Sequence, residues 1–220
     1  HVYFSMGTTA ENVAKKFNIL REEQQEFAIS SHNKAHEAQK NGKLSEEIIP
    51  IGECKEDGNI RPNSTQEKLD QLKLAFDTKG TVTAATSSPL TDGAAATIIC
   101  EENYAKENNL NILGRIISTA VEGCDPDYMG LGPIGASKKA LMRADLSIDK
   151  IDIFELNEAF ASQSLACIKD LGIDQKKVNI DGGALALGHP LGATGARITG
   201  KAADLLRREN KIYTNNKKAR

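Results

Sequence analysis

The second half of the sequence alternates short apolar runs with helical patterns, and this alternation constrains the fold more than any other feature. The strand-like runs lie at 113–121, 151–156 and 178–180, and the helical patterns that follow them lie at 136–144, 158–171 and 193–208. Strands that alternate with helices are typical of an α/β fold with the helices as crossovers. Because the 158–171 pattern is apolar nearly all round, we expect that helix to lie in the interior.

The first half carries two helical patterns and weaker strand patterns. Thr8 and Glu11 have the spacing of a capping box, which predicts a helix that begins near Thr9. A second helical pattern runs over 21–40 and ends before Gly42, a residue suited to a left-handed C-terminal cap. We expect the remaining segments to be a loop over 52–64 and strands at 47–51, 81–85 and 94–100.

The charge balance and the cysteine spacing exclude several classes of protein. With 28 basic and 30 acidic residues, the chain offers no electrostatic reason to bind nucleic acid or an anionic membrane. Its longest apolar stretches are far shorter than the roughly 20 residues that a membrane-spanning helix needs. The four cysteines form no CxxC pair, so we expect no metal site and a reducing, intracellular compartment.

Both ends of the sequence predict an internal piece of a longer protein. The chain opens at His1 without a signal-peptide pattern, and it closes on a polar run at 215–220 that we expect to be a solvated tail. A targeting signal at a natural terminus would therefore lie outside this sequence, and no Ser-Lys-Leu-like ending is present.

The stretch 181–197 is the strongest candidate for a functional site. It crowds five glycines and His189 at a junction between a strand and a helix, and Pro190 stiffens the chain after the histidine. Glycine permits positive φ angles and a close approach of the backbone to a ligand. A structural histidine is the alternative, but this glycine frame favours a functional one. A nucleotide-binding loop is disfavoured, because neither GxxxxGK[ST] nor GxGxxG is present.

Three further candidates carry weaker signals. Asn157 follows the 151–156 strand, where α/β proteins place ligand-binding groups, but its spacing alone favours a helix cap. His32 and His36 have the spacing of a zinc pair without the glutamate of HExxH, so we expect solvated helix residues. Cys100 and Cys167 lie in apolar segments, where a small inert hydrophobe is the ordinary interpretation.

With these segments in view, the chain resembles the thiolase family over almost its whole length, from Met6 to about Glu209. The matching motifs stand in the family's order at 6–12, 80–84, 91–96, 132–134, 157–160 and 182–197. The resemblance implies a layered α/β fold of two similar halves, with a loop domain inserted in the first half. It divides the chain into a partial loop domain (1–80), the closing strands of the N-terminal half (81–111) and an incomplete C-terminal half (112–220).

Thiolases cleave 3-ketoacyl-CoA with CoA, through a cysteine acyl-enzyme and a second cysteine that acts as acid and base. The resemblance places both cysteines outside this chain, one upstream and one in a downstream Cys-x-Gly-Gly-Gly-like loop. After Tyr213, residues 214–218 depart from the family's pattern. We therefore expect no turnover from the chain alone. The resemblance implies coenzyme A as a substrate, with no further cofactor and no metal.

The resemblance also implies roles for individual residues. His189 would activate the nucleophilic cysteine and bind the thioester oxygen, and Asn157 would hold the water that completes this oxyanion hole. Glu158 and Gly188 would support them. The residues that would line the CoA and acyl pocket are Met6, Arg61, Ala84, Ser88, Ala159 and Phe160. For Arg61, a solvated loop charge is the alternative.

Within the family, the sequence favours the degradative thiolases of fatty acid β-oxidation. Biosynthetic acetoacetyl-CoA thiolases commonly carry His-Met-Gly where this chain has Ser5-Met6-Gly7, whereas the segments at 60–62 and 186–192 look degradative. A biosynthetic thiolase and a truncated, inactive CoA-binding protein stay open. The resemblance implies a homodimer or homotetramer, a hydratase and dehydrogenase subunit as a further partner, and the cytoplasm in bacteria or the mitochondrion or peroxisome in eukaryotes.

Overall fold

The computed structural model describes residues 3–214 and 217–218 of the 220-residue chain. Its α-helices are α1 (Met6–Phe17), α2 (Arg21–Lys40), α3 (Gln66–Asp70), α4 (Glu102–Glu107), α5 (Gly132–Arg143), α6 (Ala161–Leu171), α7 (Ala184–Leu187) and α8 (Leu191–Arg208). Short 3-10 turns lie at Ala84–Thr86, Pro126–Leu131, Ile148–Lys150 and Gln175–Lys177. Strands β1 (Tyr213–Thr214) and β2 (Lys217–Lys218) pair antiparallel. The rest of the expected tail, 215–216 and 219–220, lies outside the described residues.

The long helices confirm the helical patterns of the sequence. α2 has the predicted bounds, and Gly42 behind it has the expected positive φ of 73°. α1 begins earlier than expected, because the Ser5 side chain caps it by accepting a hydrogen bond from the Thr8 amide at 3.1 Å. The predicted capping box is therefore wrong. Glu11 instead reaches across the fold and accepts hydrogen bonds from the Thr81 and Val82 amides at 2.9–3.0 Å.

Most of the expected strands are not formed. In 47–51, only Ile51 bridges to Cys54; in 81–85, only Thr83 bridges to Leu74. The segments 94–100 and 113–121 are extended, and the single bridge position within them is Arg115. The runs 151–156 and 178–180 meet through one parallel bridge. A strand forms only where a neighbouring segment supplies the hydrogen bonds of its ladder. The described residues bring few such segments together.

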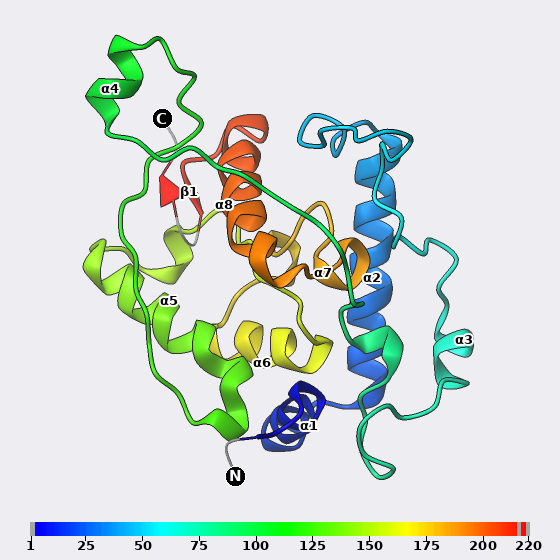
Figure 1. Ribbon diagram of the computed structural model, residues 1–220. Helices are drawn as coiled ribbons and strands as arrows, with labels where there is room; N and C mark the ends of the chain where they lie inside the picture. The colour runs from blue at the N-terminus through cyan, green and yellow to red at the C-terminus, as the bar shows by residue number, and fades with distance from the viewer. Residues whose placement is uncertain (1–2, 215–216, 219–220) are drawn as a thin grey trace.

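The core lies where α6 packs against α1, α2 and α5. On one face of the 151–156 run, Ile153 packs with Leu205 and Leu206 of α8. On the other face, Phe154 packs with Ile168 of α6. Most of α6 is buried, which confirms the interior position that its apolar pattern predicts. Figure 1 shows α7 and the start of α8 at the centre of the molecule, between α6 and α2.

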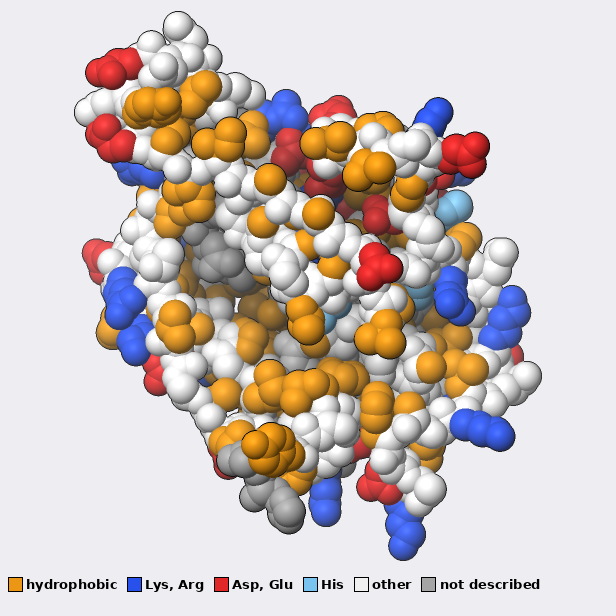
Figure 2. Space-filling model, in the orientation of Figure 1, with side chains coloured by type: hydrophobic (Ala, Val, Ile, Leu, Met, Phe, Trp, Pro, Cys, Tyr) orange, Lys and Arg blue, Asp and Glu red, His pale blue; other side chains and the backbone are white. Residues whose placement is uncertain are grey.

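An extended segment, 94–124, runs along the outside of the molecule and carries α4 at its far end (Figure 1). Many of its large apolar side chains are exposed, for example Ile98 at 89% and Ile99 at 69%. Figure 2 shows hydrophobic side chains gathered over the α4 region and along the segment that leads to it. Among the described residues, none of the helices is both long and apolar enough to cross a membrane.

Candidate active site

His189 and Asn157 meet where the 151–156 run and the 181–190 turn end side by side. The Asn157 Nδ2 atom lies 3.3 Å from the His189 Nε2 atom. The other ring nitrogen, His189 Nδ1, lies 2.7 Å from the Thr194 Oγ1 atom on the first turn of α8. Both sides of the imidazole therefore have partners, and the ring is only half-buried.

The contacts of Thr194 favour one tautomer of His189. The Thr194 hydroxyl has a single proton and lies 3.0 Å from the Pro190 carbonyl oxygen, which can only accept. When the hydroxyl donates to Pro190, its oxygen accepts from His189 Nδ1, and the lone pair of Nε2 faces the Asn157 amide nitrogen. Sequence reasoning did not single out Thr194, although a hydroxyl on the first helical turn after Gly-His-Pro is a usable signal.

The charge state of His189 suits a proton acceptor. Burial and the nearby Arg197 guanidinium lower the pKa of His189 below its usual value, so the imidazole is neutral at neutral pH. Asn157 Oδ1 is buried and has no hydrogen-bond partner among the described residues. A buried acceptor of this kind is normally satisfied by water or by a ligand.

Asn157 does not cap the helix that follows it. α6 begins at Ala161, and Phe160 occupies its N-cap position. The cap, which the spacing alone favoured, is therefore wrong. The amide of Asn157 is free to contact His189 instead.

Two glycines allow the turns of the site to pack closely. Gly188 has a φ of +96°, and a Cβ atom there would lie 2.4 Å from Thr91 Oγ1. A Cβ atom on Gly93 would lie 2.9 Å from Pro190. The 91–93 turn thus packs directly against the turn that carries His189, and the missing side chain of Gly188 permits this close approach.

Glu158 is a structural anchor beside the site. Its buried carboxylate accepts hydrogen bonds from Ser31 Oγ at 2.6 Å, Asn179 Nδ2 at 2.8 Å and the Leu185 amide at 3.1 Å. Burial raises the pKa of Glu158, while these hydrogen bonds oppose the rise. A Cβ atom on Gly183 would lie 2.1 Å from the carboxyl carbon of Glu158, so only glycine fits there. Glu158 therefore joins α2, α7 and the 179–183 turn.

Four of the predicted pocket residues lie close to one another. The Ser88 amide donates to the Ala159 carbonyl at 3.0 Å, and Phe160 forms a bridge with Ser87. The Phe160 ring meets the Phe76 ring edge-on, with centroids 6.0 Å apart.

Met6, the fourth of these pocket residues, is connected to Ser88, Ala159 and Phe160 through its neighbour Gly7. A Cβ atom on Gly7 would lie 2.1 Å from the Phe76 ring, so the first turn of α1 packs on that ring. Met6 itself is 49% exposed. Ala84 also lies on the surface, at the start of a 3-10 turn. All five of these pocket residues are exposed or half-buried, and Ala159 and Phe160 directly follow the Asn157-Glu158 pair in the sequence.

Arg61 lies in a different environment. It is exposed, and its backbone amide donates to His32 Nδ1 at 3.1 Å. His32 is only 7% exposed, so the expectation of a solvated histidine is wrong at this position. Burial and the Arg61 charge lower the pKa of His32. Among the described residues, no hydrogen bond joins Arg61 to His189.

None of the chain's cysteines is placed as a nucleophile for His189. Cys167 is buried, and burial raises the pKa of its thiol to about 12. Cys54, Cys100 and Cys124 are exposed, which corrects the apolar interpretation of Cys100. Within the described part of the chain, no cysteine forms a hydrogen bond with His189, and no cluster of His, Cys, Asp and Glu could hold a metal ion.

Comparison with protein families and relatives extends these observations. The Thiolase, N-terminal domain family matches residues 1–103, and the Thiolase, C-terminal domain family matches residues 110–216. A 3-ketoacyl-CoA thiolase of Marinobacter nauticus is 53% identical over 207 residues, which are 88% of this chain and 53% of the relative. An acetyl-CoA acetyltransferase of Shinella zoogloeoides is 49% identical over 203 residues, 89% of this chain and 52% of the relative. The chain spans about half the length of these relatives.

Solved structures agree with the backbone. Human mitochondrial 3-ketoacyl-CoA thiolase in complex with CoA has a TM-score of 0.94 and 43% identity, and the match covers 97% of this chain and 55% of that one. Bacillus anthracis acetyl-CoA acetyltransferase has a TM-score of 0.92 and 42% identity, with 96% and 56% covered. The expected layered α/β fold is thereby confirmed, with most of its strands reduced here to single bridges.

Proposed function

The chain belongs to the thiolase family, and from this premise we propose that it supplies the histidine side of a thiolase active site for the cleavage of 3-ketoacyl-CoA by CoA. The observation that carries the proposal is the His189 ring, held by Thr194 on one nitrogen and facing Asn157 with the other. A neutral imidazole can accept the proton of a thiol at Nε2 when the thiol takes the place of the Asn157 amide contact.

In this reaction His189 Nε2 takes the proton of a cysteine thiol. The thiolate attacks the 3-keto carbon, the bond between C2 and C3 breaks, and a second cysteine protonates the departing acetyl-CoA carbanion. CoA then releases the acyl group from the first cysteine as a shortened acyl-CoA. We assign neither cysteine role to this chain, because Cys167 is buried with a raised pKa and the exposed cysteines do not contact His189.

Asn157 would bind the water of the oxyanion hole. Its Oδ1 atom is buried and unpartnered among the described residues, so a water molecule could donate to it and still point its second hydrogen at the substrate oxygen. One preorganised donor of this kind stabilises a developing oxyanion by roughly 3–4 kcal/mol.

An apolar surface beside Asn157 would bind the pantetheine arm and the acyl chain. Backbone pairing joins 87–88 to Ala159 and Phe160, which supports a shared surface, and Met6 and Ala84 are exposed. We propose Arg61 as a contact of the CoA nucleotide. Its exposure suits this role and equally suits a solvated loop charge.

We favour the degradative reaction of β-oxidation, on the motifs at 5–7, 60–62 and 186–192. A biosynthetic acetoacetyl-CoA thiolase is the second candidate, because relatives of both names are about equally similar. The division into parts at 1–80, 81–111 and 112–220, the homo-oligomeric state, the hydratase and dehydrogenase partner and the compartment stay predictions.

A chimera tests the proposed roles. Residues 6–209 of this chain would replace the matching segment of the Marinobacter nauticus thiolase, which supplies whatever that relative holds outside the match. We expect turnover of medium and long 3-ketoacyl-CoA, and we expect His189→Asn to lower kcat by about a hundredfold to ten-thousandfold with little change in KM. The matched control is Arg207→Ala, on the exposed side of α8.

Two outcomes would contradict the proposal. An active chimera in which His189→Asn keeps its kcat would remove the assigned role of His189. Turnover confined to acetoacetyl-CoA would replace the degradative assignment by the biosynthetic one. Calorimetric titration of the unaltered chain with CoA tests the third possibility, an inactive CoA-binding protein, for which we expect measurable heat without turnover.

A further inference from the structure

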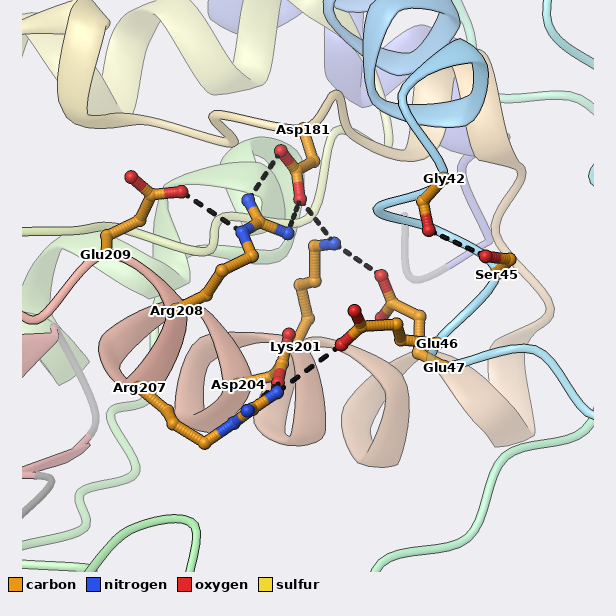
Figure 3. A network of polar contacts seen from close by, with 10 residues as sticks. All are labelled: Gly42, Ser45, Glu46, Glu47, Asp181, Lys201, Asp204, Arg207, Arg208 and Glu209. Atoms are coloured by element: carbon orange, nitrogen blue, oxygen red, sulfur yellow. Dashed lines mark hydrogen bonds and ion pairs between the residues drawn. The ribbon is translucent and has the colours of Figure 1, made fainter.

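The inner face of α8 carries a buried cluster of charges that the proposed reaction does not use (Figure 3). Lys201 is only 2% exposed, and its Nζ atom lies 2.6 Å from Asp181 Oδ2 and also pairs with Glu47. Arg208 forms a bidentate ion pair with the same aspartate: its Nη1 atom lies 2.7 Å from Oδ2 and its Nη2 atom lies 2.8 Å from Oδ1. Asp181 is thus held by two cations from one helix.

Asp181 and Lys201 stay charged through the neutral range. Burial opposes the ionisation of Asp181, but Arg208 and Lys201 hold the pKa of its carboxyl below the usual value. Burial likewise opposes the charge of Lys201, and Glu47 and Asp181 raise its pKa above the usual value. The ion pairs therefore persist at the pH at which a thiolase would work.

The cluster matters because α8 holds both ends of one loop. Asp181 begins the 181–190 loop and is held by Lys201 and Arg208. His189 lies near the end of the loop and is held by Thr194. Thr194 and Lys201 lie about two turns apart on the same face of α8. The helix that holds the His189 ring through Thr194 thus also holds the first residue of the loop through Lys201 and Arg208.

The middle of the loop is held from other elements. The Gly183 amide donates to Ser31 Oγ at 3.0 Å, and the Leu185 amide donates to Glu158 at 3.1 Å. Figure 3 shows that Glu47 approaches Lys201 from the segment that follows α2. Through Glu47, Lys201 adds a further contact between the 1–80 part of the chain and the loop that carries His189, besides that of Ser31.

We propose that Lys201 is a positioning residue for His189. By holding Asp181 against α8 while Thr194 holds the ring, Lys201 fixes the orientation and the tautomer of the imidazole. This inference rests on the proposed function of His189 and adds a residue to it. Replacing a whole buried ion pair by apolar residues is often neutral or stabilising, so the pairing of Lys201 with Asp181 is by itself weak evidence for a role in stability alone.

The test reads the ring directly by ¹⁵N NMR of the full chain labelled at histidine. The sequence has four histidines, and His189→Gln assigns the signal. In the unaltered chain we expect His189 to be protonated on Nδ1 and to titrate below its usual pKa. In Lys201→Met we expect the ratio of the Nδ1–H to the Nε2–H tautomer to fall by about tenfold. This is the factor expected if the hydrogen bond between His189 Nδ1 and Thr194 is lost. Lys201→Arg should restore the ratio.

Two controls keep the result interpretable. Arg207→Met removes an exposed pair on the same helix and should leave the His189 signals unchanged. If Lys201→Met does not fold, Asp181→Asn decides, because Lys201 then keeps Glu47 as a partner and no buried cation is left alone. A change of the His189 signals in Asp181→Asn supports the proposal.

The proposal is overturned if the Lys201→Met chain folds and its His189 signals are unchanged. If that variant does not fold, unchanged His189 signals in Asp181→Asn overturn it. This readout is independent of turnover. The positioning role can therefore fail while the chimera shows that His189 is catalytic, and the catalytic role can fail while the ring is still held by Lys201.

Discussion

At the scale of single residues, Glu155 is a buried acid that the structure keeps protonated. It is 3% exposed, and its Oε1 atom has no hydrogen-bond partner among the described residues. Burial raises the pKa of Glu155 to about 8, although Arg197 and Lys201 oppose the rise. Because alternate residues of an extended run share a face, Glu155 lies on the side of Ile153 and faces α8. At neutral pH this carboxyl group, two residues before Asn157 in the sequence, is therefore mostly protonated.

The substitution Glu155→Gln should alter how stability depends on pH. Between the unfolded pKa of 4.5 and the folded pKa of about 8, the folded chain holds a proton that the unfolded chain has lost, so stability falls as pH rises. The slope for one group is at most about 1.4 kcal/mol per pH unit. Urea denaturation should show Glu155→Gln gaining stability relative to the unaltered chain from about pH 5 to about pH 8, and no further gain above about pH 9.

Other raised carboxyl groups, such as Glu47 and Glu158, are present in both chains and cancel in this difference. A difference in the free energy of unfolding that is constant with pH would show that Glu155 ionises normally.

At the scale of elements, the sequence predicts the helices well, because amphipathic patterns and end signals act locally. The glycine-rich frame also makes His189 a candidate from the sequence alone, whereas the spacing of Asn157 indicates a helix cap that the structure does not form. Strands could not be predicted equally well, because a ladder depends on a second chain segment that local sequence does not specify. For the same reason, sequence reasoning missed Thr194, Lys201 and Glu155, whose importance arises from contacts across the fold.

Two glycine-to-alanine changes in neighbouring elements should have opposite signs. Gly195 lies exposed in α8 with nothing near its missing Cβ, so Gly195→Ala should stabilise the chain by about 1 kcal/mol through helix propensity. Gly183→Ala places a Cβ atom 2.1 Å from the Glu158 carboxyl carbon and should destabilise it by about 3 kcal/mol. Urea denaturation of both variants and of the unaltered chain measures the two changes in the free energy of unfolding. Equal effects would mean that Glu158 does not contact the 183 position.

At the scale of the whole molecule, the 94–124 segment leaves an apolar surface uncovered. Ile98 and Ile99 are among its exposed side chains, and contiguous exposed apolar surface promotes association. We expect the chain to associate in a concentration-dependent way and Ile98→Asp/Ile99→Asp to shift it toward the monomer without lowering its stability. Size-exclusion chromatography with light scattering measures this. Leu191→Asp, at an exposed site on α8, is the control, and equal association of all three chains would exclude the segment as the cause.

The hydrogen bonds of Glu11 to the 81–82 backbone have a consequence for the integrity of the molecule. Arg21 of α2 similarly donates to the carbonyls of Leu69, Asp70 and Leu72. The C-terminal end of the stretch between α2 and residue 81 is therefore hydrogen-bonded to both α1 and α2. α2 itself packs on α6 and α7. A protease cut after the exposed Lys55 would therefore break the chain without releasing either piece, and the two parts would behave as one protein until a denaturant separated them.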